Sequence, residues 1–162
     1  MSIKVCYPHF LFKLQIYTYM AYKTKFVPQN PTKYIGDINS ILCRSLWERK
    51  FCKYLDNNKN VIRWSFESIK IPYVSPVDNK VHNYLPDFII ETKDKSGQIE
   101  TMIVEIKPKK QTQQPEKGRK KKKTYLEESV TYLINEAKWK SAMNFCKEKN
   151  IKFKILTEED LF

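Results

Sequence analysis

Several signals of common protein classes are missing from this 162-residue sequence. Its four cysteines form no CxxC motif and no cysteine/histidine ladder, so a zinc site has no support and reduced thiols of the cytosolic type are expected. No stretch approaches the roughly 18 uninterrupted apolar residues that a membrane span requires. Near the N-terminus there is neither a clean apolar h-region nor a small-residue cleavage site. The sequence therefore predicts a protein without a zinc module, a secretory signal or a membrane partner.

Acidic residues are also scarce, with 18 Asp and Glu against 30 Lys and Arg, which gives a formal net charge of +12. Hydrophobic residues make up 41% of the chain and aromatic residues 14%, so intrinsic disorder is excluded for most of it. The length suits one domain with its own core. The basic excess favours a polyanionic partner such as nucleic acid.

The chain divides into an extension and one domain. We expect residues 1–24 to be an N-terminal extension, either outside the core or as an extra strand or surface helix; Met20 is a second plausible start. The domain is expected over residues 25–162, with an extended arm at 27–37 and a basic loop at 108–123.

Apolar periodicity predicts the order of elements in this domain. We expect a helix from the N-cap Asp37 to Leu55, a turn at 72–80, a hairpin turn at 94–97, a capping box (Thr124, Glu127) that begins a second helix, a helical turn at 157–160, and strands at 61–71, 81–92, 99–107 and 151–156. Cys43 and Cys52 then lie in one helix, roughly 13 Å apart, and cannot bridge each other. This order predicts an α/β fold with a mixed β-sheet flanked by helices.

Glu48 does not fit the face of the first helix on which it falls. At about 100° per residue it lies within roughly 20° of both Ile41 and Leu55, in the middle of the apolar stripe. A buried carboxylate needs a charge partner or a metal, because burying it alone costs several kcal/mol. One interpretation is a functional acid; the other is a structural salt bridge, for which Arg44 is the candidate partner.

The strand pair carries two further carboxylates among apolar neighbours. Asp87 stands in LPDFII, and Glu105 stands in MIVEIK with Lys107 two residues beyond on the same face. If the turn at 94–97 pairs these strands, one register brings Asp87 and Glu105 opposite each other. Two adjacent carboxylates suit Mg²⁺ or Mn²⁺, and a lysine beside them can assist an attacking water or a charged transition state in phosphodiester hydrolysis.

The basic loop is the candidate contact to a nucleic-acid backbone. Residues 107–123 hold nine Lys and Arg and one acid. The candidate DNA-binding residues are Lys109, Lys110, Arg119, Lys120, Lys121, Lys122 and Lys123, together with Lys138 on the following helix. Binding through them would weaken steeply with salt. The alternative is a solvated charge run with no specific contact.

The pattern Pro86-Asp87 followed by Glu105-Ile106-Lys107, with Glu48 on a preceding helix, resembles the PD-(D/E)XK nuclease superfamily. Within it the sequence is similar to the branch of head-completion nucleases of T4-like tailed phages. The resemblance covers about residues 25–161 and is carried by seven segments, at 30–37, 44–48, 71–80, 84–88, 104–108, 135–140 and 153–161.

The resemblance implies a restriction-endonuclease-like core in which Asp87 and Glu105 are metal ligands, Lys107 is the catalytic lysine and Glu48 is the helix acid, a third ligand of the metal. It also implies a late protein of the virion, present in the host cytoplasm during assembly, with the phage head, the portal or other head-completion proteins as partners. Such a protein acts on packaged DNA or its ends before tail joining.

The leading hypothesis is therefore a Mg²⁺-dependent deoxyribonuclease, with Mn²⁺ as a possible substitute and the endonuclease type favoured. One alternative is a virion protein that binds DNA ends without cleaving them. A second is a basic structural connector that contacts acidic surfaces of the capsid or portal.

Overall fold

The computed structural model describes residues 23–161. Its elements are β1 (Thr24–Lys25), η1 (Pro31–Lys33), β2 (Leu42–Cys43), α2 (Leu46–Asn57), β3 (Val61–Phe66), β4 (Ile71–Val74), β5 (Val81–Tyr84), β6 (Phe88–Lys93), β7 (Ile99–Ile106), η2 (Lys109–Gln111), α3 (Lys122–Lys149), β8 (Lys152–Leu156) and α4 (Glu158–Leu161). Residues 1–22 of the predicted extension lie outside the described residues. No helix of the described part is long and apolar enough to cross a membrane.

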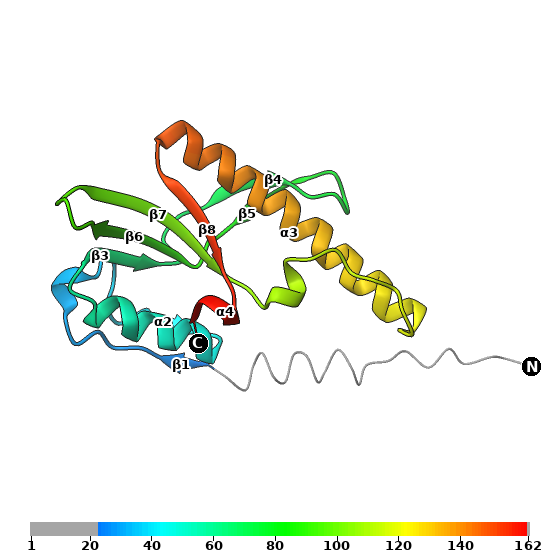
Figure 1. Cartoon of the computed structure of the whole chain (residues 1–162). Coiled ribbons are helices and arrows are strands. Elements are labelled where there is room, and N and C mark those ends of the chain that lie inside the picture. The colour runs from blue at the N-terminus through cyan, green and yellow to red at the C-terminus, as the bar shows by residue number, and fades with distance from the viewer. Residues whose placement is uncertain (1–22, 162) are drawn as a thin grey trace, which may run out of the picture.

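A four-stranded sheet in the order β3-β6-β7-β8 forms the centre of the molecule. The first three strands are antiparallel, and β8 joins β7 in parallel. Helix α2 covers one face of the sheet, while α3 and the β4–β5 hairpin cover the other, as Figure 1 shows. The predicted mixed sheet flanked by helices is confirmed.

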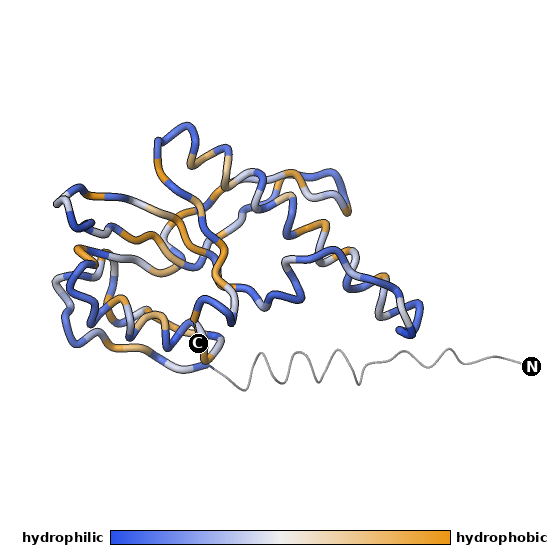
Figure 2. The backbone as a smooth tube through the Cα atoms, viewed as in Figure 1, coloured by the Kyte–Doolittle hydropathy of each residue, from blue (hydrophilic) through white to orange (hydrophobic). Residues whose placement is uncertain are grey.

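Two apolar clusters pack on the two faces of this sheet. Phe88 and Val104 pack with buried residues of α2, whereas Ile103 packs with Trp139 and Ala142 of α3. The central strands contain apolar stretches, whereas the loop before α3 is mostly hydrophilic (Figure 2). Alternation along β6 and β7 therefore directs Phe88 and Val104 to one face and Ile103 and Glu105 to the other.

The first helix begins later than predicted. A hydrogen bond from the Glu48 backbone N–H to Ser45 Oγ (3.1 Å) caps α2, and the helix starts at Leu46. Asp37 instead bonds the Asn39 N–H in a turn (2.9 Å). The apolar spacing before Ser45 arises because residues of the arm and of β2 also reach the core.

The prediction for Cys43 and Cys52 was wrong for the same reason. Cys43 lies on β2 rather than on the helix, and the chain reverses between the two residues. Both are buried and free, and their sulfur atoms lie 3.7 Å apart.

Residues 81–92 form two strands rather than one. β5 pairs with β4 in a separate two-stranded sheet, and β6 enters the main sheet. The change of sheet falls at Pro86, which has no N–H to continue a ladder. Two smaller corrections accompany it: Pro72 belongs to β4 rather than to the turn, and the strand predicted over 61–71 ends at Phe66.

The second long helix starts at Lys122, so Thr124 lies inside it and is not its cap. Lysines are good helix formers, which allows the helix to begin three residues before the predicted start. The C-terminal half of α3 packs on the sheet through Asn135, Trp139, Ala142 and Cys146. The N-terminal half extends beyond the sheet (Figure 1).

Candidate active site

The β6–β7 hairpin brings Asp87 and Glu105 together. Phe88 pairs with Val104 in the antiparallel ladder, so the next position outward sets Asp87 opposite Glu105. The Asp87 backbone N–H donates to Glu105 Oε2 (3.3 Å), and the Ile106 N–H donates to Asp87 Oδ2 (2.7 Å). The two carboxylates are therefore fixed by the backbones of each other's strands.

Lys107 lies beside this pair. It follows β7 directly, its backbone N–H donates to the Leu156 carbonyl (2.9 Å), and its Nζ lies 3.0 Å from Glu105 Oε1. Glu105 itself is only 3% exposed. The site is thus a buried Glu105 and a half-buried Asp87 with one ammonium group adjacent.

Burial and charge shift the protonation of these groups. Burial, together with the charge of Glu105, holds the pKa of Asp87 well above its ordinary value, although Lys107 and the Ile106 N–H oppose the shift. Burial alone would lower the pKa of Lys107, but the charges of Glu105 and Asp87 outweigh it and raise that pKa. Lys107 is therefore a cation rather than a base at neutral pH.

Glu48 lies at the border of the site, in the first turn of α2. Its carboxylate accepts hydrogen bonds from the Arg44 backbone N–H (2.8 Å) and from Ser45 Oγ (2.9 Å). Its charge contributes to the raised pKa of both Asp87 and Lys107, so it lies within electrostatic range of them. The Arg44 side chain does not form the salt bridge with Glu48 that the structural interpretation suggested. It forms a bidentate ion pair with Glu67.

The acids do not form a compact triad. Across residues 23–161 no group of three Asp, Glu, His or Cys side chains is close enough to hold a metal ion as it stands. The structure brings Asp87, Glu105 and Lys107 together, and places Glu48 beside them rather than among them. The donor set of two adjacent carboxylates does fit Mg²⁺.

Tyr84 and Lys138 also reach this site. The Tyr84 hydroxyl donates to Glu105 Oε2 (2.7 Å), and burial with the charge of Glu105 raises the pKa of Tyr84. Lys138 Nζ lies 5.8 Å from the centre of the Tyr84 ring, and its pKa is lowered by burial and by Lys107. Sequence patterns missed Tyr84 because it ends a strand of a different sheet.

The basic loop is partly neutralised by the described acids. Lys110 and Lys120 both bind the carboxylate of Glu128 on α3 (2.7 Å each), which lowers the pKa of Glu128 and joins the two ends of the loop. Lys109 Nζ contacts Glu159 of α4 (2.5 Å).

Of the remaining basic candidates in the loop, one has an acidic neighbour and three have no described salt bridge. Lys123 lies 3.9 Å from Glu127. Within the described residues no salt bridge involves Arg119, Lys121 or Lys122. Only part of the predicted basic surface is therefore without an acidic partner among residues 23–161.

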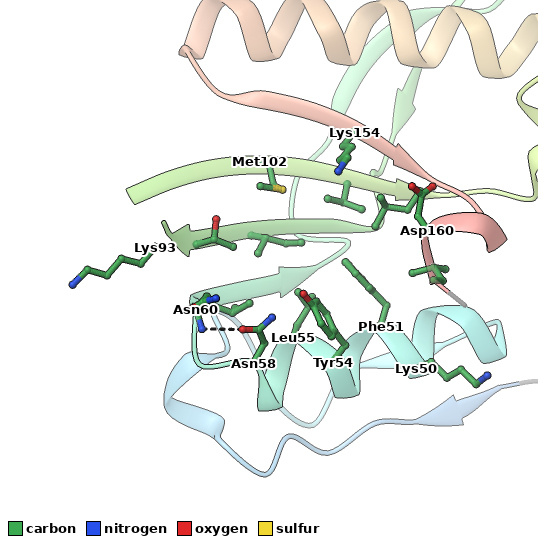
Figure 3. A pocket seen from close by; sticks show the side chains of 16 residues that line it. Lys50, Phe51, Tyr54, Leu55, Asn58, Asn60, Lys93, Met102, Lys154 and Asp160 are labelled. Carbon is green, nitrogen blue, oxygen red and sulfur yellow. Dashed lines mark hydrogen bonds between the residues drawn. The ribbon is translucent and has the colours of Figure 1, made fainter. Parts of the chain in front are cut away.

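A separate hollow of about 590 Å³ lies on the other face of the sheet, between α2, α4 and strands β6 to β8. Phe51, Tyr54, Met102 and Val104 line its apolar part, and Figure 3 shows Phe51, Tyr54 and Met102 facing it. None of the predicted catalytic residues lines this hollow. Its polar part is lined by Lys50, Lys93 and Lys154 with two asparagines, but the paired carboxylates that could hold a metal ion lie at the hairpin, which remains the candidate site.

Comparison with known proteins gives the family of this chain. The sequence pattern of the family "TnsA-like endonuclease N terminal" matches residues 58–158, which span β3 to β8 and include Asp87, Glu105 and Lys107. The chain belongs to this restriction-endonuclease-like family. It is also 42% identical over 146 residues to the head completion nuclease of Enterobacteria phage T4, a match that covers 88% of this chain and 95% of the phage T4 protein.

Proposed function

We propose that this chain is a Mg²⁺-dependent deoxyribonuclease that acts on DNA in the completion of a phage head. The observation that carries the catalytic part is the adjacent pair of acids, Asp87 and Glu105, with Lys107 Nζ 3.0 Å from Glu105 Oε1. The family of endonucleases to which the chain belongs supports DNA as substrate, and the similarity to the phage T4 protein supports the role in head completion. The phage head or portal, and a place in the virion, are part of the same proposal.

Each residue has a distinct task in this proposal. Asp87 and Glu105 would hold the metal ion, with Glu48 as a further acid at its border. A bound Mg²⁺ would lower the pKa of a water molecule and neutralise developing negative charge. Lys107 stays protonated because of its acidic neighbours, so it orients the scissile phosphate and stabilises charge on it rather than accepting a proton. Mn²⁺, which also prefers oxygen ligands, is expected to substitute.

The first prediction tests the acids directly. Cleavage of linear, branched and single-stranded DNA with Mg²⁺ should fall by at least about a thousandfold in Asp87→Ala and in Glu105→Ala, because each removes a ligand of the metal. DNA binding, measured by fluorescence anisotropy, should change by less than about threefold, because the basic surface is intact. Products from circular DNA would support an endonuclease.

Glu91→Ala provides the matched control. Glu91 lies four residues beyond Asp87, on β6, where it pairs with Arg63 on an exposed part of the strand (2.6 Å). Its loss should leave cleavage unchanged. Full cleavage by both Asp87→Ala and Glu105→Ala would reject the active site, and DNA binding by a wild type that does not cleave would favour a non-catalytic DNA-binding protein.

A further inference from the structure

Tyr84 stands out among the neighbours of the candidate active site because it comes from a different sheet. It is the last residue of β5, in the two-stranded β4–β5 sheet that lies beside α3 (Figure 1). Only 3% of its surface is exposed. Its hydroxyl nevertheless reaches the four-stranded sheet and donates to Glu105 Oε2 at 2.7 Å. Tyr84 therefore connects the second sheet to one particular oxygen of one acid.

The two oxygens of Glu105 have different partners. Oε2 accepts hydrogen bonds from the Tyr84 hydroxyl and from the Asp87 N–H (3.3 Å), whereas Oε1 faces Lys107 Nζ (3.0 Å). Rotation of the carboxylate would break the bonds to Oε2 together with the contact to Lys107. Hydrogen bonds to an ionised group are stronger than those between neutral groups, so the Tyr84 hydroxyl is a substantial part of this restraint.

We propose that Tyr84 is a positioning residue of the nuclease site, whose hydroxyl holds Glu105 Oε2 so that Oε1 is presented beside Lys107 and toward the metal. This inference rests on the proposed function, since it assigns Tyr84 a task within the same reaction. Tyr84 acts through Glu105 and makes no contact with substrate in this assignment. Preorganised ligands bind a metal more tightly than ligands that must be ordered on binding.

Tyr73 provides a control that distinguishes the effect of the Tyr84 hydroxyl from the effect of its ring. Lys138 Nζ lies 5.7 Å from the centre of the Tyr73 ring and 5.8 Å from that of Tyr84, so the two rings offer the same ammonium a similar aromatic surface. Of these two tyrosine hydroxyls, only that of Tyr84 has a described hydrogen bond to Glu105. Tyr73→Phe therefore removes a hydroxyl from the same aromatic pair without touching the acid.

The experiment compares the wild type with Tyr84→Phe, Tyr73→Phe and Glu105→Ala. Cleavage is measured as kcat and KM for DNA across a series of Mg²⁺ concentrations, and Mg²⁺ binding is measured without DNA by isothermal titration calorimetry. We expect Tyr84→Phe to lower kcat by about tenfold, to weaken Mg²⁺ binding by about five- to tenfold, and to leave KM within twofold, in line with the loss of one hydrogen bond to a charged group. High Mg²⁺ should restore part of the lost kcat. Tyr73→Phe should match the wild type.

A second measurement keeps the test independent of stability. The rise in Tm on adding Mg²⁺ reports metal binding even where a variant is less stable, and it should be smaller in Tyr84→Phe than in Tyr73→Phe. In the Glu105→Ala background, Tyr84→Phe should have no further effect on Mg²⁺ binding.

Equal Mg²⁺ binding and equal kcat in Tyr84→Phe and Tyr73→Phe would overturn the assignment of Tyr84. An equal loss in both variants would do so too, because the hydroxyl of Tyr73 has no described bond to Glu105. A wild type that neither cleaves DNA nor binds Mg²⁺ would reject the proposed function itself.

Discussion

At Asp87 the local environment opposes the charged state that catalysis requires. Burial and the adjacent Glu105 raise its pKa, and Lys107 compensates only in part. A group whose pKa is higher in the folded than in the unfolded chain stabilises the fold below its unfolded pKa, and that contribution is lost as the pH rises through the folded pKa. A rise in pH should therefore destabilise the metal-free protein, because the unfolded chain releases the Asp87 proton more readily than the folded chain does.

This reasoning predicts that Asp87→Asn stabilises the metal-free protein while it abolishes cleavage. The asparagine oxygen can still accept the Ile106 N–H (2.7 Å in the wild type), but no charge has to be buried. We expect a Tm about 2–5 °C above the wild type at pH 8 with EDTA, measured by differential scanning fluorimetry.

The pH dependence of that difference identifies its cause. The gap in Tm should shrink as the pH falls, since Asp87 then becomes protonated in the wild type as well. A gap that stays constant with pH, or a lower Tm for Asp87→Asn, would contradict the raised pKa of Asp87. Glu91→Asn, at the exposed ion pair with Arg63, is the control.

At the scale of elements, one residue in the first turn of α2 has both a structural and an electrostatic role. Glu48 accepts hydrogen bonds that close the helix N-terminus, and it also adds negative charge beside Asp87 and Lys107. Ser45 has only the first role, because its hydroxyl caps the helix through the Glu48 N–H. The two residues can therefore separate stability from catalysis.

We predict that Ser45→Ala lowers the free energy of unfolding by about 1 kcal/mol, the usual contribution of an N-cap hydroxyl, with cleavage within about threefold of the wild type. Glu48→Ala should lower both stability and cleavage, the latter by at least about tenfold. Urea denaturation and a cleavage assay at a temperature where all variants are folded would check this. Cleavage that falls equally in both variants would assign Glu48 a structural task alone.

Local patterns predicted some elements and missed others for physical reasons. The turn at Asp94–Gly97 and the alternation in β6 and β7 predict the hairpin, because its pairing is local in the sequence. The start of α2 was mistaken although Ser45 and Glu48 form a capping signature, since apolar residues of the preceding arm continued the helical spacing.

Contacts between distant segments could not be predicted in this way. The approach of Cys43 to Cys52 depends on how β2 folds back on α2, and the Tyr84–Glu105 hydrogen bond joins two sheets. Periodicity within a segment contains no information about such partners.

At the scale of the whole molecule, positive charge is concentrated where the loop meets the N-terminal half of α3. Arg119, Lys121 and Lys122 lie there without a described salt bridge, whereas Lys120 and Lys123 have acidic neighbours. Paired lysines gain less from a phosphate because they must first leave their partners. The effective DNA-binding charge of this surface is thus smaller than the composition suggests.

We therefore predict that replacing Lys120, Lys121, Lys122 and Lys123 with Gln weakens DNA binding and lowers the slope of log Kd against log salt by about 2 rather than by the nearly 4 expected of four phosphate contacts. The slope would be measured by fluorescence anisotropy between about 50 and 300 mM salt, the range over which such binding changes most. A control with the same loss of charge replaces Lys147, Lys149, Lys152 and Lys154, at the far end of α3 and on β8, and should leave the slope nearly unchanged. An unchanged slope in the first variant would support the alternative that the loop is a solvated charge run with no specific contact to DNA.

The position of the candidate catalytic acids depends on the register in which β6 pairs with β7. Six consecutive cross-strand pairs, from Phe88↔Val104 to Lys93↔Ile99, fix which residue of β7 faces Asp87. Deleting one residue between Ile99 and Val104 would reverse inside and outside for everything after it, and would turn Glu105 toward the apolar cluster beneath α2. Insertions in the turn at 94–98 would leave this alignment untouched. Evolution can therefore lengthen the tip of the hairpin freely, whereas its two strands can change length only in steps of two.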